Sequence, residues 1–403
     1  MSSRAGALSP RSSLPLPPSL VVPASPDSFT RPGPASVTSP DNGITPAFLL
    51  RNGVSFSLKP ADLNDSFGAV RVGQTATTAV VFFEEYRRTG YSQQFNLAVQ
   101  RELPGGFIVD ASVLGNLSRK LASAGMSLNQ VTPDRLTPTS TQRDRPFPQF
   151  SDVSVQLPSQ GLVNYYGLVV RAERRFAKGF SVLSTYTWSK ALNNTNEGGT
   201  TLGSEGGVYS NFYNRRADYG SGENDIAHRL TFSSVYEIPF GKGRQHLTSG
   251  PAAYLIGGWG LGGILTLQSG PPFTITTQVN PVFSAAGASR ANVSRNPNLP
   301  DSQKTLLHWF DTDAFSQPAA ATFGNSGVGI LRSDGIINAD LSLLRNFSLP
   351  GEGRRIQFRA EFFNLGNHAN FGVPGRVFGA SGFGVVSSAG PGRRIQLGLR
   401  LVF

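Results

Sequence analysis

Apolar and polar residues alternate along nine long stretches of the chain between residues 92 and 403. A period of two is the pattern of a β-strand with one apolar and one polar face. The stretches have about 10 to 14 residues each, roughly twice a typical soluble strand and enough to cross a bilayer at a tilt. The predicted strands are Ser92–Arg101, Phe107–Asn116, Val163–Phe176, Phe180–Ala191, His228–Ile238, Gly258–Ser269, Asn338–Phe347, Arg355–Leu365 and Arg393–Phe403.

The connections between these strands alternate in length. Short turns follow the first, third and seventh strands, and a connection of intermediate length follows the fifth. Long connections follow the other strands, at residues 117–162, 192–227, 270–337 and 366–392. Outer-membrane barrels have short periplasmic turns and long extracellular loops. The alternation therefore predicts an all-β fold, an antiparallel up-and-down transmembrane β-barrel portion (a partial barrel of about nine long strands), with its C-terminus in the periplasm.

The N-terminal part of the chain has a different composition. We expect residues 1–91 to form a Pro/Ser-rich irregular segment and residues 92–403 to form the barrel portion. The first 60 residues contain 11 prolines, and such a segment cannot bury enough apolar surface to fold alone. The chain starts without the apolar core of a signal peptide, and no run approaches the ~18 apolar residues of a membrane helix. Because a barrel must be exported, we expect the natural N-terminus to lie upstream.

Aromatic residues lie near the ends of the third and fourth predicted strands. Tyr166 and Phe176 share the apolar face of one strand, and Phe180, Tyr186 and Trp188 lie on the next. Ten residues of strand span ~34 Å, or ~24 Å when tilted by ~45°, which is close to the height of the apolar band of a barrel. These five residues are therefore predicted to lie at the two membrane interfaces. The core of a β-sandwich would explain the alternation, but not aromatic residues at both strand ends.

The last predicted strand has the clearest alternation. Arg394, Gln396 and Arg400 lie on its polar face. Its opposite face is apolar and is predicted to contact outer-membrane lipid, through Ile395, Leu397, Leu399, Leu401 and Phe403. A chain that ends on an aromatic residue after such a strand resembles the signal by which outer-membrane barrels are inserted, so the barrel-assembly machinery is an expected partner.

Composition removes several other classes of function. The chain has no cysteine, and its four histidines lack the spacing of metal ligands, so no metal site is expected. The net charge of +11 could suggest nucleic-acid binding, but the arginines are scattered in a way that suits a barrel lumen or anionic head groups. Only 15% of residues are charged, well below the ~25% of soluble domains.

No motif indicates catalysis or a cofactor. Residues 258–263 match Gly-x-Gly-x-x-Gly, but they lack the strand–turn–helix context of a dinucleotide site. Carboxylates such as Asp218 and Asp225 lie in a long connection, and Glu361 alternates with Arg359 as an ion pair on a polar face would. We therefore expect a protein that is not an enzyme and that carries no cofactor.

Five separated blocks and the terminal strand resemble Oar-like TonB-dependent receptors, in which they recur in the same order. The most recognisable pieces are Tyr-Thr-Trp-Ser-Lys at 186–190, Pro-Phe-Gly-Lys-Gly at 239–243 and Phe-Phe-Asn-Leu at 362–365. The five blocks are residues 91–121, 165–194, 225–244, 257–275 and 337–372.

The resemblance implies a barrel of about 22 strands, a plug, a carboxypeptidase-regulatory-like domain and a segment that contacts TonB. Roughly half of the strands and all of the other parts are expected to lie outside this sequence. Contact with the TonB system would therefore be made only through the missing N-terminal part. Residues 1–91 would correspond to an extracellular loop of the intact receptor.

The function implied by the resemblance is TonB-energised uptake of a bulky solute across the outer membrane. The sequence leaves the solute open. The alternatives are a non-transporting surface or adhesion β-barrel that displays extracellular loops, and a secreted glycan-binding β-protein. Within the connection 192–227, a cluster of aromatic, basic and amide side chains is the first candidate for ligand contacts, although solvated loop residues would look the same: Asn211, Phe212, Tyr213, Arg215 and Arg216.

Overall fold

The computed structural model describes residues 22–24, 69–123, 125–195, 210–241, 246–282, 289–349 and 354–403. Its largest unit is an antiparallel sheet in which nine long strands are neighbours in chain order, with the short β9 (Gly220–Ser221) added beside β8. All nine strands predicted from the alternation are present, which confirms the all-β, up-and-down fold. The nine strands are β3 (Tyr91–Leu103), β4 (Phe107–Leu121), β7 (Gly161–Ala177), β8 (Phe180–Asn193), β10 (His228–Glu237), β11 (Trp259–Gln268), β17 (Ile336–Ser348), β18 (Arg355–Phe363) and β20 (Arg394–Val402).

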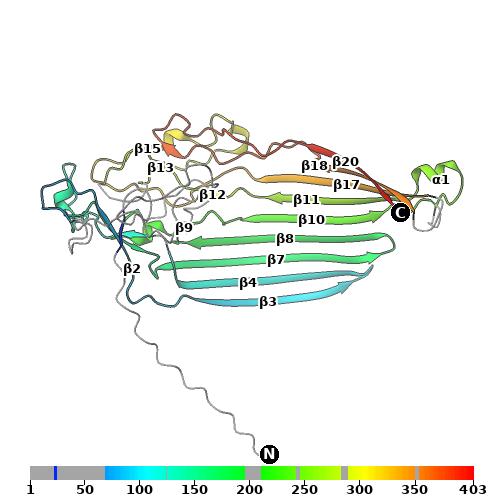
Figure 1. The fold of residues 1–403 in the computed structure, drawn as a ribbon, viewed down its shortest axis with the longest axis horizontal. Helices are drawn as coiled ribbons and strands as arrows, with labels where there is room; N and C mark the ends of the chain where they lie inside the picture. Colours follow the sequence, from blue (N-terminus) through cyan, green and yellow to red (C-terminus); the bar gives the residue numbers. More distant parts are fainter. Residues whose placement is uncertain are drawn as a thin grey trace, which may run out of the picture.

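The two ends of the sheet differ in their connections, as Figure 1 shows. At one end the strands are joined by short turns and by a connection that contains the helix α1 (Pro251–Ile256). In the β7–β8 turn, Lys178 and Gly179 both have positive φ (51° and 78°), as a two-residue turn that follows the strand twist requires. At the other end lie the four long connections. We call these two ends the turn end and the loop end.

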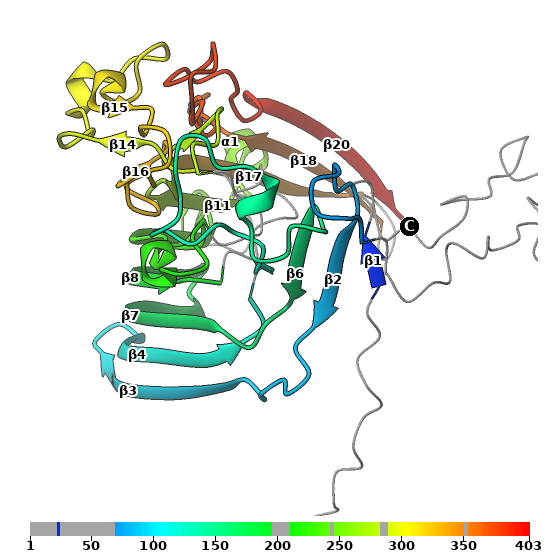
Figure 2. The ribbon, with the colours of Figure 1, turned by 90° about the vertical axis from the view of Figure 1, so that its left-hand side faces the viewer.

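The sheet is curved but not closed. Figure 2 shows it bending from β3 through β8 and β11 to β20, so that one face is concave. Within the described ranges, β3 pairs only with β4 and β20 pairs only with β18. Both edges of the sheet therefore expose a full row of backbone hydrogen-bonding groups.

A second, smaller sheet lies at the loop end and was not anticipated from the sequence. Its order is β1-β2-β6-β5. The strand β2 forms inside the segment that we expected to be irregular, because its Ala-Val-Val-Phe-Phe sequence is apolar and pairs in parallel with β6. Nearly all of residues 1–68 lie outside the described ranges. The four strands are β1 (Val22–Ala24), β2 (Ala79–Phe83), β5 (Met126–Ser127) and β6 (Asp152–Gln156).

The long connections after β11 and β18 pack together around a core of their own. The ring of Phe310 lies 5.2 Å from that of Phe383 and 5.9 Å from that of Phe273, measured between centroids. Short strand pairs tie the same connections to each other and to themselves, and none of the described helices could span a membrane. The pairs are β12 (Pro272–Phe273) with β16 (Leu331–Arg332), β13 (Thr276–Thr277) with β19 (Val377–Phe378), and β14 (Asn292–Val293) with β15 (Phe315–Ser316). The buried side chains of this core are Phe273, Ile275, Ala291, Trp309, Phe310, Ala314, Phe315, Leu331 and Val386.

Candidate functional site

The strand register divides the large sheet into an apolar and a polar face. Residues paired directly across neighbouring strands point to the same face, whereas adjacent residues of one strand point to opposite faces. One row across seven strands is apolar throughout: Val99, Ala111, Val170, Tyr186, Leu230, Leu267 and Ile337. The row formed by their immediate neighbours is polar throughout: Gln100, Asp110, Arg171, Thr185, Thr231, Thr266 and Asn338.

The same division continues to the last strand. Leu397 pairs with Ala360 and Leu399 with Phe358, whereas Gln396 pairs with Glu361. Many of the described side chains on the apolar face are exposed, and Leu399 is 73% exposed. An exposed apolar surface of this extent marks a contact with lipid or with protein.

Aromatic side chains lie on the apolar face at both ends of the strands. Toward the loop end, Tyr166 lies beside Phe95, with 6.4 Å between ring centroids. At the turn end, Phe180 lies beside Tyr236 at 6.1 Å. By register, Tyr166, Phe180, Tyr186 and Trp188 all belong to this face.

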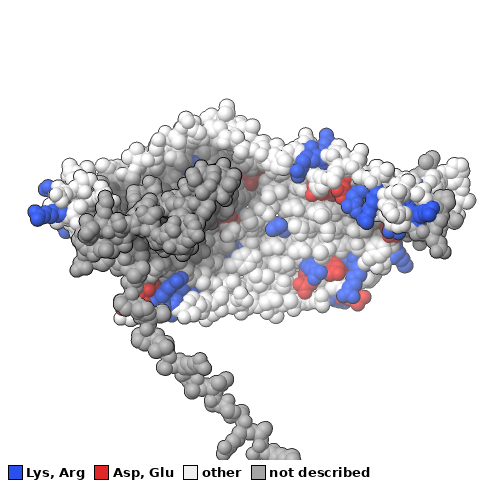
Figure 3. All heavy atoms as spheres, viewed as in Figure 1, with Lys and Arg blue, Asp and Glu red and all other residues white. Residues whose placement is uncertain are grey.

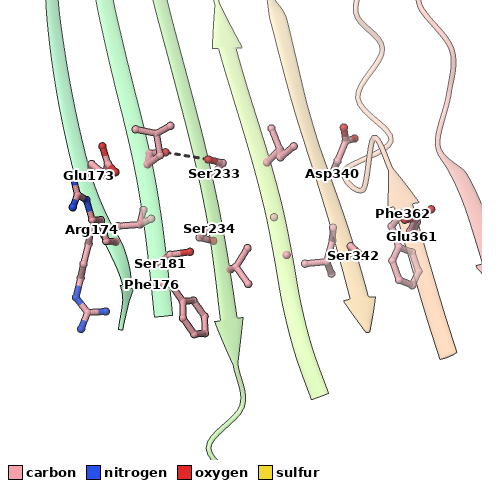
Figure 4. A pocket seen from close by; sticks show the side chains of 18 of the residues that line it. Glu173, Arg174, Phe176, Ser181, Ser233, Ser234, Asp340, Ser342, Glu361 and Phe362 are labelled. Carbon is pink, nitrogen blue, oxygen red and sulfur yellow. Dashed lines mark hydrogen bonds between the residues drawn. The ribbon is translucent and has the colours of Figure 1, made fainter. Parts of the chain in front are cut away.

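Phe176 does not share this face, contrary to the alternation of its strand. A β-bulge between Arg174 and Ala177 shifts the register, which reverses the direction of the side chains that follow it. Phe176 consequently lines the groove on the polar side, near Ser181 (Figure 4). Arg174 stays on the apolar face and reaches back to the turns, where it donates to the carbonyls of Gly105 (2.9 Å) and Phe180 (3.1 Å).

The polar face forms a groove of about 700 Å³ along the concave side of the sheet. Figure 4 shows Glu173, Ser233, Asp340 and Glu361 along it. Figure 3 shows acidic and basic side chains close together on the same side of the molecule. The predicted pair of Arg359 with Glu361 is present, with 3.6 Å between Nη1 and Oε1. Because charges of both signs alternate with hydroxyl groups, this surface suits an aqueous lumen.

The residues that the sequence suggested as ligand contacts mainly fix one connection to another. Asn211 is buried, and its Oδ1 accepts hydrogen bonds from the backbone N–H groups of Tyr213 (2.9 Å) and Asn214 (3.2 Å). Phe212 packs against the small cluster of Met126 and Val155.

Tyr213 and Arg215 make contacts of the same kind. The Tyr213 hydroxyl donates to the carbonyl of Gln130 (3.2 Å), and Arg215 donates to Gln160 (2.6 Å). Burial is the first cause of the raised pKa of Tyr213, and the nearby charge of Asp134 adds to it. Arg216 remains exposed.

Two buried carboxylates organise the loop end, and the sequence did not reveal their partners. Asp218 pairs with Arg290, which comes from the connection after β11. Asp225 is fully buried and accepts hydrogen bonds from Lys190 Nζ (2.7 Å) and Arg332 Nη2 (2.5 Å). Its other oxygen accepts from the backbone N–H of Ala191 (2.7 Å). Ion pairs between connections that lie about 70 to 110 residues apart have no local signature, so only the fold could identify them.

Comparison with known proteins agrees with this architecture. The family model described as "Outer membrane beta barrel domain" matches residues 25–396, and the chain belongs to that family. No curated protein matches the chain. Members of an outer-membrane barrel family lie in the outer membrane, where strands with one apolar and one polar face are stable.

Several solved structures are similar over most of this chain. The outer membrane transporter YddB from Escherichia coli is 10% identical, with a TM-score of 0.40, over 80% of this chain and 34% of that one. The ferric preacinetobactin receptor BauA from Acinetobacter baumannii is 11% identical, with a TM-score of 0.38, over 78% and 29%. The FrpB iron transporter from Neisseria meningitidis is 10% identical, with a TM-score of 0.37, over 80% and 32%. This chain thus matches about a third of the length of each.

Proposed function

We propose that this chain forms the C-terminal part of the wall of an Oar-like, TonB-dependent outer-membrane receptor that takes up a bulky solute. The observation that carries the proposal is the pair of adjacent rows, one apolar and one polar, that cross seven strands without interruption. An arginine at the bilayer midplane costs about 2–4 kcal/mol on the lipid face but little on the lumen face. A sheet with this division is suited to separate lipid from an aqueous lumen.

The proposal assigns a role to each end of the sheet. The long connections lie at one end and form the extracellular surface that captures the solute, including residues 69–91. The turn end and the C-terminus face the periplasm. Tyr166, Tyr186 and Trp188 lie at the outer interface and Phe180 at the inner one. Strand β20 and Phe403 are the contact for the barrel-assembly machinery, and the plug and TonB contact come from the rest of the receptor.

The direction of the edge strands supports closure by further strands of the same receptor. Each of the nine strands is antiparallel to its neighbour, so β3 and β20 run in the same direction. A second copy inserted in the same orientation would place β20 beside β3 as a parallel pair. An odd number of additional strands keeps every pair antiparallel, as in outer-membrane barrels.

The experiment that tests this function uses cells that make the complete receptor. Spent growth media of the parent strain, a receptor-deletion strain and a TonB-deletion strain are compared by untargeted mass spectrometry. We expect at least one solute that the parent removes and both deletion strains leave behind. If the parent strain carries the receptor at its surface and the receptor-deletion strain removes the same solutes from its medium, the chain belongs to a barrel that displays loops without transport.

A further inference from the structure

A second cavity, of about 380 Å³, lies among the connections at the loop end. Its volume falls within the ~300–1,000 Å³ of small-molecule sites. It is separate from the groove of the polar face and shares no lining residue with it. The walls come from the connection before β10 and the connection after β11: Ser210, Asn211, Asn214, Ala217, Val282, Ser289, Arg290, Phe323, Gly324, Asn325, Ser326 and Gly327.

Two side chains that line this cavity each have a buried polar atom with no hydrogen-bond partner among the described residues. These atoms are Nε of Arg290 and Oγ of Ser326, on side chains that are 8% and 2% exposed. Buried polar groups in folded proteins are nearly always paired, so two unpaired atoms in one cavity indicate a site that a polar molecule fills. The opposite side of the Arg290 guanidinium is already occupied by Asp218.

The charge of the cavity determines the class of ligand. Among the described residues that line it, Arg290 is the only one with a charged side chain, and the buried carboxylate of Asp218 neutralises it. A second anion would find no uncompensated positive charge there, and a cation would be repelled by the guanidinium. The ligand is therefore uncharged, and it must accept a hydrogen bond from Arg290.

The other residues that line the cavity narrow the class of ligand further. The hydroxyl of Ser326 can donate or accept, and Asn214 adds an exposed amide nearby. The half-buried ring of Phe323 gives the cavity an apolar wall. Hydroxyl groups that donate and accept at once, next to a face of C–H groups, are the surface of a sugar ring. We propose that this cavity binds a sugar unit of a neutral glycan, which, resting on the proposed function, names the class of solute that the receptor captures.

The test measures binding to isolated outer membranes that contain the complete receptor. The probes are fluorescent oligosaccharides of glucose, mannose, galactose and xylose, with oligogalacturonate as the acidic counterpart. We expect one neutral probe to bind, and Ser326→Ala and Arg290→Lys each to weaken it tenfold or more. The matched controls are Ser302→Ala and Arg295→Lys in the same connection, where Ser302 is exposed and Arg295 pairs with Asp311 outside the cavity. They should bind the probe as the parent does.

Heat-modifiable gel mobility shows whether each variant is folded. Ser326→Ala removes a single oxygen and keeps the proposal testable even if Arg290→Lys fails to fold. The proposal is overturned if no neutral probe binds, if oligogalacturonate binds best, or if folded Ser326→Ala binds unchanged. Binding to isolated membranes needs no energy source, so a receptor that binds the glycan but does not import it would contradict only the proposed uptake.

Discussion

At the scale of single residues, Asp225 is the clearest point at which the loop end is joined to the barrel wall. Its carboxylate contacts Lys190 at the end of β8 and Arg332 in β16. Burial by itself would raise the pKa of Asp225, but the hydrogen bonds from Lys190 and Ala191 and the charges of Lys190 and Arg332 outweigh it and lower the pKa below the ordinary 3.8. The ionised form is therefore the one that stabilises the folded protein.

Asp225→Asn should destabilise the protein at neutral pH. Lys190 and Arg332 would lose their buried partner. Because both are partly exposed, we expect the free energy of unfolding to fall by about 3 kcal/mol, which is at the low end for such pairs. A carboxyl with a lowered pKa stabilises the fold above its unfolded-state pKa and loses this effect as the pH falls through its folded-state pKa. Urea unfolding of the complete, membrane-embedded receptor should therefore show a difference from the parent at pH 7 that shrinks as the pH falls below 3.8.

Asp301→Asn is the matched control. Hydrogen bonding and the charge of Lys304 also lower the pKa of Asp301, but this side chain is 95% exposed, so its loss should have no measurable effect on unfolding. Equal losses for the two variants, or a difference for Asp225→Asn that does not change with pH, would contradict the role given to the buried carboxylate.

At the scale of elements, helix α1 is attached to the turn end of the sheet by Arg345. By register Arg345 lies on the apolar face opposite Trp259, yet only 6% of it is exposed. Its guanidinium carbon lies 4.1 Å from the ring centroid of Phe347, 5.4 Å from that of Trp259 and 5.6 Å from that of Tyr254, and it donates to the Tyr254 carbonyl. A desolvated cation over aromatic rings contributes about 2 kcal/mol.

Arg345→Leu should therefore release α1 from the sheet. The expected result is faster limited proteolysis within residues 238–258, mapped by mass spectrometry, with the rest of the barrel still protected. Arg345→Lys keeps the charge but loses the planar stacking, and should give an intermediate rate. Arg174→Leu removes another arginine from the turn end without touching α1, and cleavage within 238–258 at the rate of Arg345→Leu in this control would contradict the role of Arg345.

The terminal strand β20 offers the sharpest test of the two faces. Leu399 pairs with Phe358 on the apolar face, and its neighbour Arg400 pairs with Gln357 on the polar face. In the complete receptor, Leu399→Arg should lower the yield of folded barrel strongly, since a lipid-facing arginine costs about 2–4 kcal/mol near the midplane. Arg400→Leu should have a much smaller effect. Equal assembly of the two variants, read by heat-modifiable gel mobility, would contradict this assignment of the two faces.

The strands differ in how far the sequence predicts them. The nine long strands follow from alternation alone, because a period of two sustained over ten residues is rare by chance. Strands β2 and β6 have only five residues each, too few for the pattern to separate them from loop. The predicted face of the Phe176 side chain was wrong, because a bulge adds a residue to one strand only and the pattern of a single strand does not record it.

The candidate site, like the strands, could be predicted only in part from the sequence. The polar face could be predicted, including the pair of Arg359 with Glu361, because it is the complement of the apolar alternation. The cavity containing Ser326 and Arg290 could not be predicted, because its walls come from two connections far apart in the sequence, which are joined by the pair of Arg290 with Asp218 and the pair of Arg332 with Asp225. Asn211 was singled out as a ligand contact, and the structure places it in the wall of this cavity while its Oδ1 holds a turn.

At the scale of the whole molecule, the two open edges decide how the chain can exist in a membrane. The outer edges of β3 and β20 are unpaired within the described residues, and both lie next to exposed apolar side chains such as Leu97 and Leu397. Each unpaired backbone N–H or C=O in hydrocarbon costs several kcal/mol. A sheet with two such edges cannot be stable in lipid until other strands cover them.

The last prediction follows from these edges and concerns assembly from two pieces. Made alone, this chain should stay insoluble without detergent, because an open edge of this length pairs with other copies. It should also give no compact heat-modifiable species in the outer membrane. When the remaining strands of the receptor are supplied as a separate polypeptide, the two pieces should form the heat-modifiable barrel. The resembled barrels have about 22 strands, so about thirteen further strands would give both edges an antiparallel partner. The Leu399→Arg chain should fail in the same complementation. A compact heat-modifiable species from this chain alone, or a monodisperse soluble monomer, would mean that the sheet closes by itself and that the wall is complete with nine strands.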